Sequence, residues 1–281
     1  MEALSPELGW PGYRVRSVLR WRGGVACHEE DSVAEEVPVA MMYNGEPHVV
    51  MLATPLDLED FALGFSLTEN IVASPVEVES IRVFQRSEGI EVRLRVPPAR
   101  CENVADKGRN MTGRTGCGLC GARTLQQAIR RPPVVPDGVR VSSVELANAL
   151  AGFRDHQRLN AITGAVHAAA WVVPAVGTVL VREDVGRHNA LDKLIGALAR
   201  QKTDFTRGFV VVTSRASFEM VQKCAMMGIG CLAAISAPTG LAIRLAEETG
   251  LTLVGFARNH DHVVYANPQR LIHHPARPDP G

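Results

Sequence analysis

The second half of the chain alternates between short apolar runs and amphipathic segments, and this alternation constrains the fold more than any other feature. Apolar runs typical of strands lie at 166–173, 178–181, 208–213, 231–235 and 251–256. Segments whose apolar residues recur at helical spacing lie between them, at 186–200, 217–227 and 239–249. Strands that alternate with helices at this spacing form βαβ units, so the pattern predicts a mostly parallel sheet with helices on its faces.

The first 100 residues are rich in strand patterns instead. Apolar runs at 37–43 and 48–53 flank Asn44-Gly45, the signal of a two-residue hairpin turn. Asp57 is expected to cap a helix over 58–70, and a second hairpin is expected over 81–96. Further along the chain, Ser143 is expected to cap a helix over 144–156.

A stretch rich in proline and glycine at 131–138 marks the expected boundary between two domains. We predict an α+β, hairpin-rich domain over 1–135 and an α/β domain over 136–281, with a disordered tail from about residue 275. A chain of 281 residues buries about three quarters of its unfolded surface on folding. It therefore needs neither disulfides nor a structural metal to be stable.

Charge and composition exclude several kinds of partner. Thirty Lys and Arg residues balance thirty Asp and Glu, and aromatic residues make up only 5% of the chain, so no nucleic-acid partner is expected. No apolar run reaches the eighteen residues typical of a membrane span, and the first twelve residues do not resemble a secretory signal. We therefore expect a cytoplasmic protein without a membrane partner, in which the six cysteines are reduced thiols.

Cys117 and Cys120 form a Cys-x-x-Cys pair at the end of a glycine-rich segment, 97–121, that lacks hydrophobic periodicity. A helix is expected from about residue 121 to residue 131, which places both thiols at its N-terminus. The helix macrodipole and the free N–H groups there favour a thiolate, and neighbouring arginines such as Arg114 add positive charge. The pair is interpreted as a reactive thiol on a functional loop.

Other uses of this pair stay open on the residues alone. A structural zinc site needs two further ligands, and because no second Cys-x-x-Cys is present we expect no bound zinc. A thioredoxin-like redox pair directly follows an early strand, whereas this pair follows a long loop. His167 begins an alanine-rich run, but residue 169 is Ala, so the His-x-Glu signature of the zinc deaminases is incomplete.

Polar turns follow three of the predicted strands. Two of them carry Arg187 and His188 and, further on, Ser214 and Arg215, each pair close to the start of a helix. The third turn consists of Phe256, Ala257, Arg258, Asn259, His260 and Asp261. Because parallel strands end at the same edge of a sheet, and helix N-termini there bind anions, we expect these turns to line one edge close to the Cys117 loop.

Several longer stretches resemble the FdhD/NarQ family of formate dehydrogenase accessory sulfurtransferases. They follow one another along nearly the whole chain at 36–39, 61–65, 112–121, 163–171, 183–193, 214–223 and 253–256. The resemblance implies a fold similar to that of cytidine deaminases, a mixed sheet with flanking helices but without the zinc. It also implies that Cys117 carries a persulfide, with Cys120 as the second cysteine of the pair, and that the protein is a homodimer.

A protein of this family takes sulfur from a cysteine desulfurase and transfers it to the molybdenum of the bis-molybdopterin guanine dinucleotide cofactor, before that cofactor enters formate dehydrogenase. The resemblance assigns cofactor contact to the turn 256–261, and the turns with Arg187, His188, Ser214 and Arg215 would hold the guanylyl and pyrophosphate groups. Relatives often carry arginine where Asp261 stands, so Arg258 is expected to supply the charge. A non-catalytic cofactor-binding chaperone and a small zinc-stabilised redox regulator are the alternatives.

Overall fold

The structure, a computed structural model, describes residues 10–100 and 131–273 and confirms a mixed α/β fold. The chain forms two compact units. Unit 1 comprises residues 1–130, 157–168 and 182–202, and unit 2 comprises residues 131–156, 169–181 and 203–281. The units therefore interleave along the sequence, unlike the division at residue 135 that was expected. The expected helix over 121–131 and the expected disordered tail lie outside the described residues.

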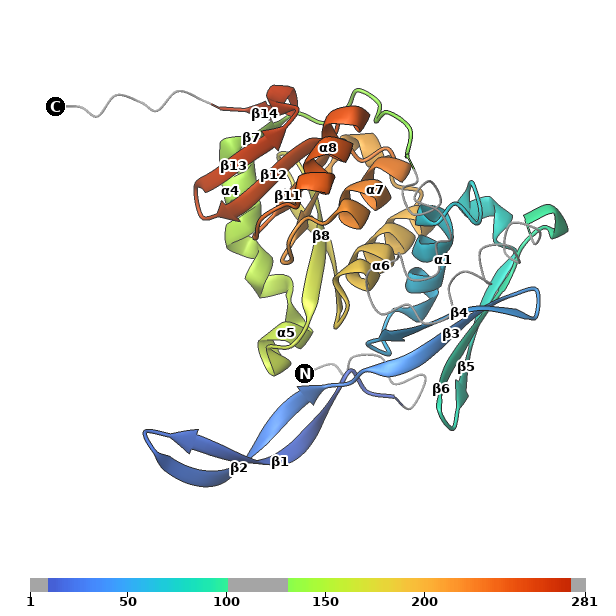
Figure 1. The fold of residues 1–281 in the computed structure, drawn as a ribbon, viewed down its shortest axis with the longest axis vertical. Helices are drawn as coiled ribbons and strands as arrows, with labels where there is room; N and C mark the ends of the chain where they lie inside the picture. Colours follow the sequence, from blue (N-terminus) through green and yellow to red (C-terminus); the bar gives the residue numbers. More distant parts are fainter. Residues whose placement is uncertain (1–9, 101–130, 274–281) are drawn as a thin grey trace. The chain divides into compact units, whose positions relative to one another are not determined.

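Unit 1 contains an antiparallel two-stranded ribbon and a four-stranded sheet of order β4-β3-β6-β5 (Figure 1). The strands are β1 Tyr13–Arg22, β2 Val25–Ala34, β3 Val37–Tyr43, β4 Glu46–Ala53, β5 Ser80–Arg86 and β6 Gly89–Arg95. Both predicted hairpins, β3–β4 and β5–β6, are confirmed. In the first, Asn44 and Gly45 have φ values of 51° and 93°, the positive values that a type I′ turn requires.

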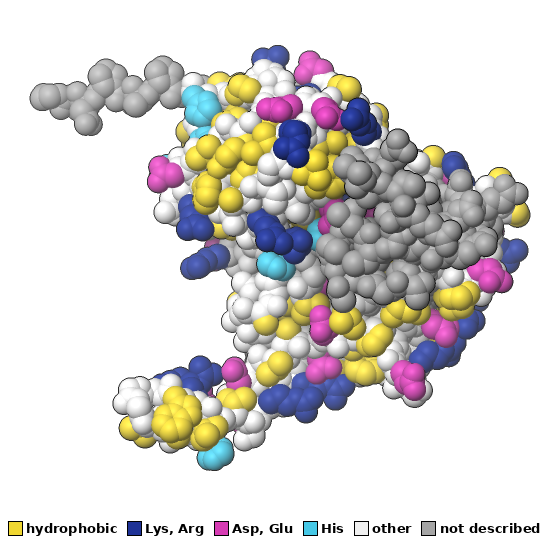
Figure 2. Space-filling view, in the orientation of Figure 1, with side chains coloured by type: hydrophobic (Ala, Val, Ile, Leu, Met, Phe, Trp, Pro, Cys, Tyr) yellow, Lys and Arg dark blue, Asp and Glu magenta, His cyan; other side chains and the backbone are white. Residues whose placement is uncertain are grey.

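The ribbon, formed by β1 and β2, exposes hydrophobic side chains to solvent, as Figure 2 shows at its lower left. Its register runs from Tyr13 opposite Ala34 to Arg22 opposite Val25. Each strand is ten residues long, and among the described strands neither pairs with any other strand. A two-stranded sheet is only marginally stable in water on its own, so this exposed surface calls for an explanation.

Helices α1 (Leu58–Thr68) and α6 (Arg187–Arg200) pack side by side in unit 1 (Figure 1). Their backbones approach closely at Gly64 and Gly196, because a side chain at either glycine would overlap the backbone of the other helix. Through this contact α6, although late in the sequence, belongs to the same compact unit as the N-terminal strands. Asp57 precedes α1 as expected, but its φ is 52° and its side chain caps no N–H group, so the predicted capping role was wrong.

Most of unit 2's strands form a six-stranded sheet of order β13-β12-β11-β10-β8-β9, in which residues 167–168 of β8 and 182–184 of β9 are assigned to unit 1. The strands are β8 His167–Val173, β9 Gly177–Asp184, β10 Phe209–Val212, β11 Cys231–Ala234, β12 Thr252–Arg258 and β13 Asp261–Ala266. Strands β10, β11 and β12 are parallel, as the βαβ pattern predicted. Strands β8 and β13 run antiparallel to β10 and β12, which makes the sheet mixed rather than mostly parallel.

Helices α7 (Phe218–Met226) and α8 (Gly240–Thr249) pack against each other and connect the three parallel strands. Helix α4 (Ser143–Phe153) packs against β12 and follows the short strand β7 (Val141–Ser142), which pairs with β14 (Leu271–Ile272). The cap of α4 is Ser142, one residue before the expected Ser143. Its hydroxyl accepts a hydrogen bond from the Glu145 N–H at 3.1 Å, while the Glu145 carboxylate accepts one from the Ser142 N–H at 2.8 Å.

The short helix α5 (Arg158–Thr163) belongs to unit 1 and ends at Gly164, whose φ is 64°. Within residues 10–100 and 131–273, no helix is long and apolar enough to cross a membrane.

Candidate functional site

The turns that follow β10, β11 and β12 meet at one edge of unit 2. The Ile235 N–H donates to the Val212 carbonyl at 3.0 Å, and the Thr239 N–H donates to the Ala216 carbonyl at the same distance. The Phe256 N–H donates to the Ser236 carbonyl at 3.2 Å. The structure therefore brings the predicted residues 214–215 and 256 together, through a turn at 236–239 that sequence reasoning missed. Ser236, Pro238 and Thr239, which follow the strand at 231–234 and precede a helix, were the available signal.

This edge of unit 2, defined by residues 213–217, 236–239 and 256–260 and here named the strand-end edge, is suited to anions. Helices α7 and α8 begin there, with Ser217 and Thr239 at their N-cap positions, and helix N-termini attract negative charge. Arg215 and Arg258 are exposed, and the Arg258 guanidinium donates to the Ile235 carbonyl at 3.3 Å.

A further arginine, Arg244, lies near the start of α8. Its Nη1 atom is 3.8 Å from the position that a Cβ atom on Gly240 would occupy. Arg244 was not among the residues predicted from the sequence, because it lies in the middle of an amphipathic helix where an exposed arginine is ordinary. With Arg215 and Arg258 it gives unit 2 three arginines that phosphate groups could contact.

Phe256 has an unusual backbone and a partly exposed ring. Its φ is 50°, a left-handed conformation that is rare for an aromatic residue, and its side chain is 44% exposed. The preceding Gly255 packs against Pro238 and Tyr265, at 2.7 and 2.9 Å from where its Cβ would lie. An exposed aromatic ring can stack on a nucleotide base.

The predicted turn at 256–261 is shorter than expected. Strand β12 continues to Arg258 through an irregularity between Gly255 and Arg258, and β13 begins at Asp261, so the turn itself is Asn259-His260. Asn259, His260 and Asp261 are exposed, whereas Ala257 is fully buried. Ser214 is also buried, and its hydroxyl donates to the Arg215 carbonyl at 3.0 Å.

The turn that carries Arg187 and His188 belongs to unit 1, at the start of α6. Both side chains are half-buried. The expectation that this turn lines the same edge as residues 214–215 and 256–261 therefore stays a prediction. The residue at the N-cap position of α6 is Gly186, which has no side chain that could cap the helix.

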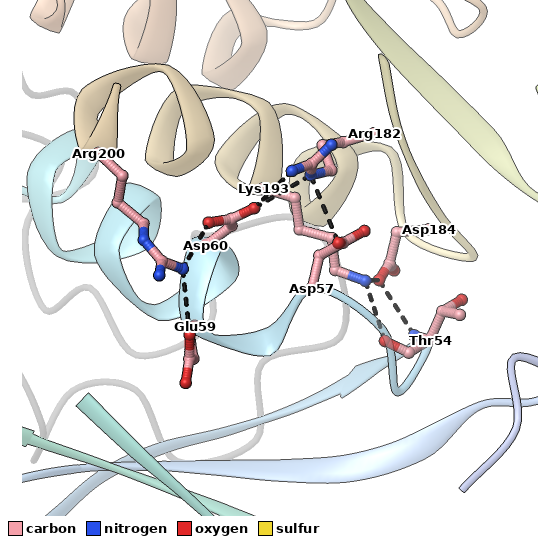
Figure 3. A network of polar contacts seen from close by, with 8 residues as sticks. All are labelled: Thr54, Asp57, Glu59, Asp60, Arg182, Asp184, Lys193 and Arg200. Carbon is pink, nitrogen blue, oxygen red and sulfur yellow. Dashed lines mark hydrogen bonds and ion pairs between the residues drawn. The ribbon is translucent and has the colours of Figure 1, made fainter. Parts of the chain in front are cut away.

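Asp184 instead fixes this turn from within a buried polar network (Figure 3). Its carboxylate accepts hydrogen bonds from the Gly186 N–H at 2.8 Å and the Asn189 side chain at 2.9 Å. Lys193 lies 2.7 Å from the other carboxylate oxygen and donates to the Thr54 carbonyl at 2.9 Å. Lys193 and Asp184 are both fully buried, so the turn preceding Arg187 is rigidly held.

His167 lies in unit 1, at the start of β8. Burial lowers the pKa of its imidazole, and the positive charges of Arg187 and His188 lower it further, while Asp184 opposes them. The neutral form of His167 is therefore favoured beside the Arg187 guanidinium. This environment fits the prediction that the Arg187–His188 turn attracts an anion.

Cys117 and Cys120 lie outside the described residues, so their predicted role stays a prediction. Among the described cysteines, two are buried and one is exposed. Burial raises the pKa of the Cys224 and Cys231 thiols far above neutral pH, which keeps both unreactive, and Cys27 is exposed on the ribbon. In the described ranges, no three His, Cys, Asp or Glu side chains are grouped as metal ligands would be.

The fold is a mixed α/β sheet whose parallel strands end at two helix N-termini with arginines nearby, an arrangement suited to phosphate-bearing ligands. The comparisons are more specific. The FdhD/NarQ family model matches residues 34–272, and the chain belongs to this family.

Two curated relatives are both described as sulfur carrier protein FdhD. One, from Xanthomonas campestris pv. campestris strain B100, is 54% identical over 261 residues, which is 93% of each chain. The other, from Bordetella petrii, is 53% identical over 257 residues, 91% of this chain and 92% of the relative. A crystal structure of a protein described as a formate dehydrogenase accessory protein, from Desulfotalea psychrophila, shows the same fold with a TM-score of 0.76. It is 22% identical and covers 93% of this chain and 100% of its own.

Proposed function

We propose that this protein is a sulfur carrier for the maturation of formate dehydrogenase and that Cys117 holds the sulfur. The observation that carries the proposal is the 54% identity, over 93% of both chains, to relatives described as sulfur carriers. The described cysteines support the choice of thiol indirectly. Cys224 and Cys231 are too buried to react, and Cys27 precedes the residues that the family model matches.

The sulfur is carried as a persulfide. The Cys117 thiolate attacks the terminal sulfur of a persulfide on a cysteine desulfurase, and the desulfurase cysteine leaves as a thiolate. For delivery, the Cys120 thiolate attacks Cys117 Sγ. A Cys117–Cys120 disulfide forms, and the terminal sulfur leaves as hydrosulfide with the electron pair of the broken S–S bond. The acceptor is the molybdenum of the bis-molybdopterin guanine dinucleotide, which is a substrate here and not a resident cofactor.

The strand-end edge of unit 2 is proposed to hold the guanine nucleotide part of this substrate. Arg215 and Arg258 would contact its phosphates, together with the N–H groups at the starts of α7 and α8. The exposed ring of Phe256 would stack on the guanine. Arg187 and His188 in unit 1 are proposed as additional anion-binding residues.

Cys117→Ala is expected to abolish formate dehydrogenase activity when it replaces the wild-type protein in cells, because the variant has no thiol to accept sulfur. The measurement is formate dehydrogenase activity in an extract of those cells, with the variant protein quantified by immunoblot. Cys27→Ala is the matched control, because it removes an exposed thiol of the ribbon and should leave the activity at its wild-type value. Wild-type activity in Cys117→Ala would refute the proposal.

Arg215→Ala is expected to weaken the binding of guanosine diphosphate about tenfold or more. A charge-assisted hydrogen bond to phosphate contributes about 1.5–3 kcal/mol, and the variant loses it. Isothermal titration calorimetry measures the effect. Arg140→Ala is the control, because this exposed arginine lies at the opposite end of the strands. Its neighbour Val139 donates a backbone hydrogen bond to the Thr206 carbonyl, just before β10 begins.

Persulfide formation on Cys117 should be unchanged in Arg215→Ala. A variant that binds the nucleotide normally but accepts no sulfur would instead assign Arg215 to the contact with the sulfur donor. The same titration on Arg187→Ala decides whether the unit 1 turn contributes to nucleotide binding.

A further inference from the structure

Two histidines of unit 2 face each other at the surface. The Nε2 atom of His262 lies 2.9 Å from the Nε2 atom of His273. Their rings are nearly parallel, with an interplanar angle of 18° and 5.1 Å between the ring centroids. His262 is half-buried and His273 is exposed. The two nitrogen atoms therefore share one position that ions in the solvent can reach.

Regular strands hold both residues in place (Figure 1). His262 is the second residue of β13, which pairs with β12. His273 directly follows β14, which pairs with β7. The short turn Pro268–Arg270 lies between the two strands in the sequence. Backbone hydrogen bonds of two sheets therefore position the two imidazoles, and their approach does not depend on the conformation of one exposed loop.

The hydrogen bonds of His262 leave a lone pair on its Nε2 atom. The ring donates a hydrogen bond to the backbone carbonyl of His260. Since Nε2 faces His273, the donor is Nδ1, and the neutral ring then has no proton on Nε2. Burial lowers the pKa of His262 and the nearby His273 lowers it further, against the opposing effects of the His260 carbonyl and Asp261, so the neutral form is favoured. An imidazole whose Nδ1–H is held by a carbonyl is typical of a metal ligand.

The second imidazole can supply a ligand of the same kind. With Nε2 of His262 unprotonated, the proton between the two rings belongs to His273. Because His273 is exposed, water can carry this proton to its Nδ1 atom, which leaves a lone pair on each Nε2 atom. A metal ion can then take the place of the shared proton, and a turn of the exposed His273 ring lets both lone pairs converge on it. The negative charge of Asp261, which acts on His262, adds attraction for a cation.

The number of ligands and their separation favour one class of metal. Imidazole nitrogens bind metals at about 2.0–2.1 Å, so two of them lie about 2.9 Å apart at a right angle and about 3.3 Å apart in a tetrahedral site. The separation of 2.9 Å between His262 and His273 fits the right angle of square-planar and tetragonal sites, which Cu²⁺ and Ni²⁺ prefer. Structural zinc takes four protein ligands, and the part of the chain that the structure describes has no group of even three.

We propose that His262 and His273 form a binding site for a divalent transition-metal ion of the Cu²⁺ and Ni²⁺ class, with water in its other coordination positions. The family model matches residues 34–272, so it includes only one of the two ligands. The site therefore does not depend on sulfur transfer, which the proposed function assigns to Cys117. A metal ion bound there would join β13 to the residue that follows β14.

Isothermal titration calorimetry of the full-length protein with Ni²⁺ tests the site. The exposed cysteines are alkylated first, because thiolates also bind transition metals. The wild type should bind one Ni²⁺ ion per chain, and His262→Ala and His273→Ala should each weaken this binding about tenfold or more. Mg²⁺ should not bind, since it prefers oxygen ligands.

His156→Ala is the matched control. It removes an exposed histidine of unit 2 that lies outside the pair, and this variant should bind Ni²⁺ like the wild type. The double variant His262→Ala/His273→Ala should bind no more weakly than either single variant, because the two imidazoles act on the same ion and their losses do not add. Circular dichroism verifies that the variants fold.

Two results would overturn the proposal. One is a wild type that binds no Ni²⁺, which would leave the two histidines joined by a hydrogen bond only. The other is a His262→Ala or His273→Ala variant that folds and binds Ni²⁺ as tightly as the wild type, which would place the metal elsewhere on the chain.

Discussion

Gly64→Ala is expected to lower the free energy of unfolding by about 3 kcal/mol or more. At this residue α1 touches α6 backbone to backbone. A Cβ atom on Gly64 would overlap the Asp192 carbonyl and lie 2.9 Å from the Gly196 amide nitrogen. Neither group can rotate away, because both belong to the backbone of α6. The two helices would have to move apart and leave poorly packed side chains between them.

Denaturant-induced unfolding, followed by circular dichroism, measures this loss. Gly152→Ala is the matched control, because Gly152 lies in α4 with no atom within 4 Å of the position of the new methyl group. Alanine should leave stability unchanged there or raise it by about 0.5–1 kcal/mol, since it favours helix more than glycine does. Equal free energies of unfolding of the two variants would contradict the close backbone contact between α1 and α6 at Gly64.

Lys193→Met is expected to destabilise the protein by about 3–5 kcal/mol. The side chain volume is nearly preserved, but the Asp184 carboxylate loses the buried ammonium group that lies 2.7 Å away. Both partners are fully buried, so water cannot replace the lost charge. The Thr54 carbonyl also loses its hydrogen bond from Lys193.

Arg200→Met on the same helix is the control for Lys193→Met. Arg200 pairs with Glu59 and Asp60, each at 3.1 Å, but it is exposed, so its loss should change stability by about 1 kcal/mol or less. The double variant Asp184→Asn/Lys193→Met should recover part of the loss because it removes both buried charges. If Lys193→Met and Arg200→Met have the same free energy of unfolding, the network of Figure 3 does not stabilise the turn that precedes Arg187.

Local signals in the sequence predicted most of the elements. Asn44-Gly45 gave the first hairpin because both residues tolerate positive φ, and the apolar runs gave β10, β11 and β12 with the helices between them. The sequence predicted the helices better than it predicted which residue caps each helix. Two adjacent serines stand at the start of α4, and only the reciprocal bonds with Glu145 select Ser142 over Ser143 as the cap.

The errors arose where distant residues decide the structure. The sequence does not reveal that Gly64 and Gly196 are opposed, so the pairing of α1 with α6 and the interleaving of the two units could not be anticipated. Strand β13 was missed because its polar residues Asp261 and His262 resemble a turn. The irregularity in β12, where Phe256 is left-handed, depends on packing of Gly255 against Pro238 and Tyr265.

The candidate site was predicted in part. The rule that parallel strands end at one edge correctly joined Arg215 and Phe256, because both follow strands of the parallel trio. The same rule could not place Arg187 and His188, which follow β9 in another compact unit. It also missed Arg244, whose position depends on how its side chain lies over the start of α8.

Mass spectrometry of the full-length protein, after incubation with a cysteine desulfurase and cysteine, tests the central claim most directly. The account predicts a gain of one sulfur, about 32 mass units, on the peptide that contains Cys117. Cys120→Ala should still gain this mass, since Cys120 acts only in release, whereas Cys117→Ala should gain none. A persulfide on a different cysteine of the wild type, or an undiminished gain in Cys117→Ala, would contradict the assignment of Cys117 as the sulfur carrier.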